Sequence, residues 1–126
     1  MFDQEVTGNL KLQLRHFTGT QRYHRFHSKT VLTDGALYLA EQARCFWLMD
    51  VFASHLTQVS REMGFACLKL RREGESAHIS IEDGNESLLA VQEIGYTDFP
   101  LEDMMLFASW TTRNGGCWVI MLTSEY

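Results

Sequence analysis

The chain has 126 residues and a mass of 14.5 kDa, which is the size of one ordinary domain. Hydrophobic residues make up 45% of the chain and charged residues 21%, with a single proline, so the composition excludes a disordered, collagen-like or low-complexity protein. The formal net charge of −5 and the pI near 5.4 argue against a typical nucleic-acid-binding domain, whose pI usually exceeds about 9.

The first predicted element is a short helix over residues 6–17. Leu10, Leu14 and Phe17 are spaced by four and three residues, so they share one helix face. After a turn, the side chains of residues 23–28 alternate between two sides of the chain. We expect this arm to be extended or irregular.

One long helix is predicted from Thr33 or Asp34 to about Ser60. Either of the first two residues supplies a capping oxygen, and the segment that follows is rich in helix formers. A helical wheel predicts a buried apolar arc formed by Ala36, Leu39, Ala40, Ala43, Phe46, Trp47 and Val51. A second apolar strip beside it needs a cover from other segments or from a partner, and consists of Leu37, Leu48 and Phe52.

The hydrophobic period changes to two after Gly64, which predicts a meander of three strands. Two of them form a hairpin over residues 66–81, with its turn at 73–75. The Asp-Gly-Asn sequence at 83–85 is a second turn signal, and residues 88–96 form the third strand.

Another short helix is predicted over residues 97–111. Pro100 fits the first helical turn, and the acids Glu102 and Asp103 lie near the positive end of the helix dipole. The unbroken apolar run at 117–122 then predicts a strand covered on both faces.

These elements predict a single α+β domain over residues 1–126. Its sheet is mainly antiparallel and has about four strands, namely the meander and the C-terminal strand. One long helix and shorter helices pack against the sheet.

Nothing in the sequence indicates a membrane span or a secretory signal. The longest apolar run, 45–49, is far shorter than the roughly 20 residues that cross a bilayer, and the N-terminus is acidic. Three widely spaced cysteines, Cys45, Cys67 and Cys117, lie in apolar surroundings that are typical of reduced thiols. We expect a cytoplasmic protein.

Charge is distributed unevenly along the chain. Residues 10–33 contain five basic side chains, three histidines and no acid, whereas ten acids and only one base, Arg113, follow from Glu73 onward. Two such regions either steer a partner by fields of opposite sign or are ordinary solvated faces. The candidate partner-binding residues are Arg15, Arg22, Tyr23, Arg25, Asp83, Glu86, Glu102 and Asp103.

The weak candidates for catalysis are Asp50 and His24. Asp50 falls inside the apolar arc of the long helix, and a buried carboxylate must be paired or hydrogen-bonded. It is either a general acid or base, or a structural residue bonded to loop amides, to a tyrosine hydroxyl or to a basic side chain of the arm. An enzyme or ligand-binding domain would use both residues with Tyr23 or Tyr96, in a pocket between the long helix and the arm.

No metal and no cofactor are predicted. His16, His24, His27 and Asp34 are potential ligands, but their spacing on an extended chain does not complete a set. Signatures of a catalytic nucleophile, a phosphate loop or a dinucleotide site are missing.

The basic segment 10–33 leaves nucleic-acid binding as an alternative. It interleaves arginines with Phe17, Tyr23 and Phe26, a combination that binds single strands by charge and stacking. The overall acidity of the chain argues against it.

Several sequence boxes together resemble a bacterial domain family of unknown function. They read F-T-G-T-Q-R-Y at 17–23, T-D-G at 33–35, Y-L-A-E-Q-A at 38–43, F-W-L-M-D at 46–50 and E-I-G-Y-T-D-F-P-L at 93–101. The likeness spans most of the chain and implies no activity. It does imply a setting on phages, plasmids or other mobile elements, where such proteins are often met.

The leading hypothesis is a small non-catalytic protein of a mobile element that binds a host or defence protein, as an anti-CRISPR inhibitor does. It rests on the small size, the uneven charge, the surplus apolar surface on the long helix and the setting that the resemblance implies. A homo-oligomer is a further option.

Overall fold

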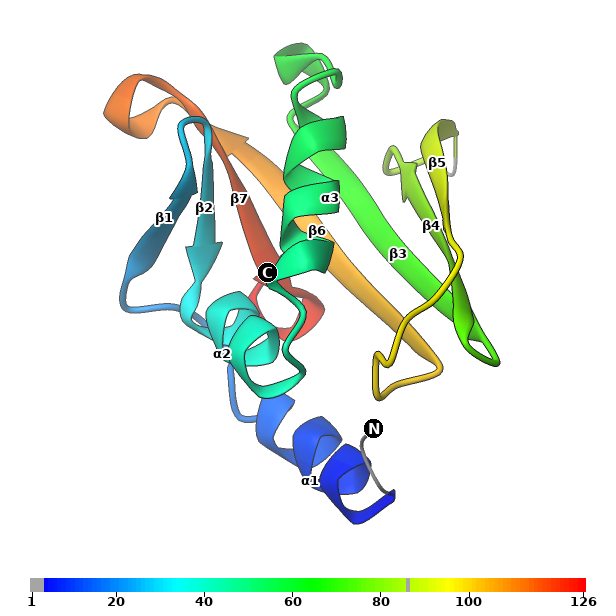
Figure 1. Ribbon diagram of the computed structural model, residues 1–126. Helices are drawn as coiled ribbons and strands as arrows, with labels where there is room; N and C mark the ends of the chain where they lie inside the picture. Colours follow the sequence, from blue (N-terminus) through cyan, green and yellow to red (C-terminus); the bar gives the residue numbers. More distant parts are fainter. Residues whose placement is uncertain (1–3, 86) are drawn as a thin grey trace.

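The computed structural model describes residues 4–85 and 87–126. The helices are α1 (Gln4–Leu14), α2 (Asp34–Gln42) and α3 (Phe46–Leu56), and short 3₁₀ turns are η1 (Arg61–Met63), η2 (Arg113–Gly115) and η3 (Thr123–Glu125). The strands are β1 (Tyr23–His27), β2 (Thr30–Thr33), β3 (Phe65–Glu73), β4 (Ser76–Glu82), β5 (Leu88–Ile94), β6 (Asp103–Thr111) and β7 (Cys117–Leu122) (Figure 1).

Seven strands form one mixed sheet in the order β1-β2-β7-β6-β3-β4-β5 (Figure 1). The β2–β7 pair is parallel, and every other neighbouring pair is antiparallel. The α+β class is confirmed, but the prediction of about four antiparallel strands is wrong, because β1, β2 and β6 also join the sheet. The basic arm forms one edge of the sheet, and β5 forms the other.

The prediction of one long helix is also wrong, because the chain bends between α2 and α3. The predicted cap is present, since the Thr33 hydroxyl accepts the backbone N–H of Ala36 at 3.2 Å. Arg44 then adopts a left-handed backbone with φ of 53°, which no helix can continue. Neither glycine nor proline marks this bend in the sequence.

The bend changes which side of α3 is buried. Phe46 and Asp50, which the helical wheel places on the buried side, are exposed, whereas Leu48 and Phe52 from the second strip are buried. The surplus apolar strip is therefore largely covered by the protein itself.

The helix predicted over 97–111 is wrong as well, because β6 occupies most of that range. The Thr97 hydroxyl accepts the N–H of Phe99 at 3.1 Å within a turn. Arg72 of β3 holds the following loop, since its backbone N–H donates to the carbonyl of Glu102 at 2.7 Å and its guanidinium donates to the carbonyl of Phe99 at 2.9 Å. These contacts lead the chain into a strand that pairs with β3 and β7.

The rest of the sheet agrees with the hydrophobic pattern. The predicted hairpin is β3 and β4, and the third strand is β5. The apolar run at the C-terminal end is β7, which lies inside the sheet between β2 and β6, as predicted.

Helices α2 and α3 lie against one face of this sheet (Figure 1). The core on that face joins helix residues such as Leu39 and Phe52 to strand residues such as Leu68, Ile79 and Leu106, all at most 1% exposed. None of the helices in the described residues combines the length and the apolar character that a bilayer span requires.

Candidate functional site

The sheet face opposite α2 and α3, called the open face below, carries exposed apolar side chains. They belong to residues of β1, β5 and β6 that alternate with less exposed residues, and Tyr126 joins them by stacking on this face. Their exposed fractions range from 40% to 76%, for Met105, Val91, Tyr23, Leu88 and Tyr126. An apolar group gathered on one face is typical of an interaction surface.

An aromatic cluster lies near the middle of the open face. Phe65 of β3 and Phe107 of β6 have ring centroids 5.0 Å apart. Tyr126 packs edge-on against both rings, at 5.3 and 5.4 Å. The geometry is the one that aromatic rings prefer, and it holds Tyr126 in place although its side chain is largely exposed.

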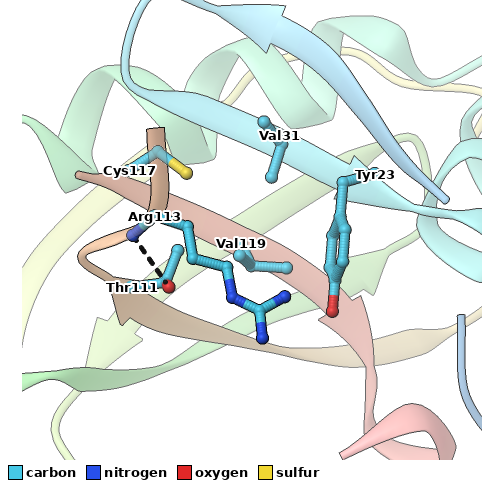
Figure 2. Close-up of a pocket in the computed structure, with 6 residues that line it drawn as sticks. All are labelled: Tyr23, Val31, Thr111, Arg113, Cys117 and Val119. Atoms are coloured by element: carbon cyan, nitrogen blue, oxygen red, sulfur yellow. Dashed lines mark hydrogen bonds between the residues drawn. The ribbon is translucent and has the colours of Figure 1, made fainter. Parts of the chain in front are cut away.

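The β1 side of this face contains a cavity of about 240 Å³, called the β1 cavity below. Residues from β1, β2, β6, η2 and β7 line it, namely Tyr23, Val31, Thr111, Arg113, Cys117 and Val119 (Figure 2). Tyr23 is the predicted site residue that lines it. In the β1 cavity a cationic group and a hydroxyl lie beside an apolar floor.

A wider hollow of about 560 Å³ lies on the β5 side. Leu88, Val91 and Met105 line it together with Asp103, a predicted partner-binding residue. Lys69, which also lines it, forms an ion pair with Glu82 at 3.1 Å. This hollow therefore combines apolar side chains with charges of both signs.

The uneven charge of the sequence is separated across the sheet. Arg22, Arg25 and Lys29 are exposed at the β1 edge. On the β4–β5 side one acid is neutralised, since Lys69 pairs with Glu82 in the hollow, and Glu93 has a hydrogen bond with His78. The field on that side is weaker than the count of acids in the sequence indicates.

The other predicted partner-binding residues do not gather in one patch. Arg15 is exposed after α1, and Glu102 is exposed before β6. Asp83 turns its carboxylate into its own loop, where it accepts the backbone N–H groups of Asn85 and Ser87 at 2.8 and 2.9 Å. Glu86 lies outside the described residues.

Asp50 is not the buried carboxylate that the sequence predicts. Its side chain is 59% exposed, and its Oδ1 lies 2.7 Å from Nε2 of His27, a residue of the arm. The expected structural partners included a basic side chain of the arm, and the partner found in the arm is a histidine. The prediction that Asp50 is buried is wrong because of the bend before α3. A shallow groove of about 460 Å³ beside this pair includes Lys29 and Ser54.

His24 pairs with a different carboxylate, that of Asp34 at the start of α2, at 2.7 Å. The hydrogen bonds from His24 and from the backbone N–H of Gln21 hold the pKa of Asp34 below its ordinary value. The backbone N–H of Asp34 in turn donates to the Thr20 hydroxyl at 2.8 Å. The F-T-G-T and T-D-G boxes therefore meet in one hydrogen-bonded cluster, and His24 belongs to it.

Glu125 completes this cluster from the opposite end of the chain. Its carboxylate accepts the Thr33 hydroxyl at 2.6 Å, the N–H of Gly35 at 3.1 Å and the N–H of Leu122 at 2.9 Å. A Cβ on Gly35 would lie 2.5 Å from that carboxylate, so a larger residue at this position would displace the Glu125 side chain. These contacts join β7 to the start of α2.

The comparison with protein families matches a family of unknown function, DUF6876, over residues 8–126. The chain belongs to this family. The searches of curated proteins and of solved structures gave no match. The resemblance to a family of unknown function is thereby confirmed, while the motif boxes and the mobile-element setting stay predictions.

Sequence reasoning missed most of the open face of this DUF6876 protein. Met105 and Phe107 were assigned to a helix, and Val31 and Val119 meet only through the parallel β2–β7 pair. The available signal was Arg113, the single base after Glu73. Tyr23, Val31 and Val119, which line the β1 cavity with Arg113, do not share a sequence motif with it.

Proposed function

We propose that this DUF6876 protein is a small non-catalytic binding module that inhibits a host or defence protein, in the manner of an anti-CRISPR. The open face of the sheet is the surface that it uses. One observation carries the proposal, the gathering of exposed Tyr23, Leu88, Val91, Met105 and Tyr126 on the face opposite the helices. Apolar and aromatic groups with a polar rim are the usual make-up of protein interfaces.

The two ends of the open face differ in charge, which gives the surface an orientation. Arg22 and Arg25 stand at the β1 edge, whereas Glu93 and Asp103 stand on the β5 side. Charged rims raise association rates and select the register of docking more than they raise affinity. Association with the partner is therefore expected to slow as ionic strength rises.

The cellular setting in this proposal is the cytoplasm of a cell that carries a mobile element. The free thiols of Cys45, Cys67 and Cys117 support a reducing compartment. The mobile-element setting rests on the resemblance of the sequence boxes alone.

Capture from host lysate tests the proposal. Wild-type protein, a Val91→Arg variant of the open face and a Leu12→Arg control on α1 serve as baits, each with and without nuclease. Both replaced residues are more than half exposed, so both variants should fold. We expect one stoichiometric protein partner that resists nuclease, binds the control bait equally and is lost from the Val91→Arg bait.

Two other results would reject the proposal. If no stoichiometric protein is captured, the proposal of a protein-binding module is rejected. Capture that disappears with nuclease instead favours the alternative of nucleic-acid binding by residues 10–33, which predicts a steep loss of affinity with salt.

An enzyme or ligand-binding domain is the second candidate, and the groove beside His27 and Asp50 favours it. An imidazole paired with a carboxylate can accept and donate protons, and Ser54 and Lys29 line the same groove. The sequence predicts one pocket in which Asp50 and the arm histidines, His24 among them, lie with Tyr23 or Tyr96. In the structure His24 pairs with Asp34, and Tyr23 lies on the open face. A folded Asp50→Asn variant that retains every assigned activity would remove this candidate.

A further inference from the structure

The β1 cavity has an apolar floor inside the sheet. Val31 and Val119 are direct neighbours in the parallel β2–β7 register, and Val119 is only 7% exposed. The buried thiol of Cys117 lies beside them. A volume of about 240 Å³ holds roughly eight water molecules at about 30 Å³ each, so the space fits a small group rather than a large ligand.

Two polar groups stand at the rim of this floor. Figure 2 shows the guanidinium of Arg113 and the hydroxyl of Tyr23 extending to the same side, with Val119 between them. The backbone of Arg113 is held at both ends, since its N–H donates to the Thr111 hydroxyl at 3.3 Å and its carbonyl accepts the N–H of Gly116 at 2.9 Å.

Gly116 shapes the turn that carries Arg113. Its φ is +97°, and a Cβ there would lie 2.6 Å from the ring of Trp110. Only glycine tolerates both this positive φ and the close approach of the Trp110 ring, so the backbone at the end of η2 is fixed beside the sheet. The Arg113 side chain starts from a rigid position.

The charge of the cavity is positive. None of the six residues that line it is acidic. Arg25 is paired in register with Val31, so a second guanidinium emerges on the same face next to the cavity. Within residues 4–85 and 87–126, neither Arg113 nor Arg25 has an ion-pair partner.

We infer that the β1 cavity binds a carboxylate that carries a short apolar group. The planar fork of Arg113 matches the two oxygens of a carboxylate, the Tyr23 hydroxyl donates a further hydrogen bond, and the valine floor accepts the apolar part. The carboxylate belongs either to a free small acid or to an acidic side chain of a protein. A free acid needs no protein partner, so this inference survives if the proposed inhibitor function fails.

Calorimetric titration with two pairs of probes tests this inference. Isobutyrate is compared with isobutyramide, and acetyl-Ala-Glu-Ala-amide is compared with acetyl-Ala-Gln-Ala-amide. Isobutyrate binding identifies a free small acid, whereas binding of the glutamate peptide alone identifies a protein side chain. In each pair the uncharged probe is expected to bind at least about tenfold more weakly, because it loses a charged hydrogen bond.

Three variants assign the binding to the cavity. Arg113→Gln is expected to lower the affinity for the charged probe at least about tenfold, and Tyr23→Phe is expected to lower it about threefold. Arg71→Gln is the control for an arginine elsewhere on the open face, since Arg71 is an exposed residue of β3 that lines the hollow on the β5 side and pairs with Glu73. The inference is overturned if neither acid binds, if the amides bind equally well, or if Arg71→Gln weakens binding as much as Arg113→Gln.

Discussion

The two faces of the sheet are built from the same strands but have opposite properties. On β6, Leu106 is fully buried against the helices, whereas its neighbour Met105 is 40% exposed on the open face. Since burial of apolar area is the main source of stability, the helix-covered face should determine whether the chain folds. The open face contributes less to folding, and its residues are free to serve recognition.

The largest expected effect separates the two faces by stability. Phe52→Ala empties a fully buried site of α3 and should lower the free energy of unfolding by about 3–5 kcal/mol. Met105→Ala on the open face should lower it by only about 1 kcal/mol, because 40% of that residue's surface is already exposed to water. Urea denaturation measures both values. Equal losses would contradict the assignment of the two faces.

The second largest expected effect is a difference in thiol reactivity between the two faces of the sheet. Burial raises the pKa of Cys45 from 9.0 to about 12, so its thiolate fraction is about a thousandfold lower than that of an ordinary thiol. Cys67 of the open face is partly exposed, although burial also raises its pKa. Alkylation at pH 8, followed by peptide mass spectrometry, should modify Cys67 first. Early modification of Cys45 in the native protein would show that α2 and α3 do not pack as described.

A smaller effect is expected at the junction of β7 with α2. Glu125→Ala leaves the Gly35 and Leu122 N–H groups and the Thr33 hydroxyl without their acceptor. The cost should be about 1–3 kcal/mol in urea unfolding. Glu102→Ala, an exposed glutamate before β6, serves as the control and should cost less than about 0.5 kcal/mol. A Glu125→Ala variant as stable as the control would show that this junction does not stabilise the fold.

The smallest effect is a change in acid sensitivity. The pKa of Asp34 is lowered in the folded protein, mainly by its hydrogen bond with His24, so its ionised form stabilises the fold above the ordinary aspartate pKa of about 3.9. This stabilisation is lost as pH falls through the ordinary value toward the lowered one. Thermal unfolding between pH 6 and 3 should therefore depend less on pH in Asp34→Asn than in wild type.

Asp98→Asn is the control for that experiment, because Asp98 is an exposed aspartate of the loop before β6. Its pH dependence should follow wild type. Parallel curves for wild type and Asp34→Asn would show that the Asp34 cluster does not contribute.

The elements predicted correctly from the sequence are those whose hydrophobic periodicity matches one type of secondary structure. In the β3–β4 hairpin, buried apolar residues alternate with less buried and mostly polar residues, so its period of two is visible. β6 is apolar toward both the core and the open face, and with Pro100 and two acids before it the segment resembled a helix. The bend at Arg44 has no local signal, since arginine rarely adopts the left-handed backbone and neither glycine nor proline stands nearby.

The candidate site was predictable only in part for a related reason. Tyr23 and Arg25 stood out because the arm is locally basic and aromatic. The floor of the β1 cavity depends on the parallel pairing of Val31 with Val119, and no local pattern indicates which distant segments will pair. Asp50 was misplaced because its position depends on the bend and not on its own neighbours.

The central claim is that the open face binds the partner, and one matched pair of variants tests it most directly. Met105 and Met63 are the same residue type with exposed fractions of 40% and 41%, but Met63 lies in η1, outside the sheet. The affinity of the purified partner is measured by calorimetry for wild type, Met105→Arg and Met63→Arg. A loss of at least about tenfold in Met105→Arg, with Met63→Arg within about twofold of wild type, is the predicted result. Equal affinities for the two variants, or a loss in Met63→Arg alone, would contradict the claim.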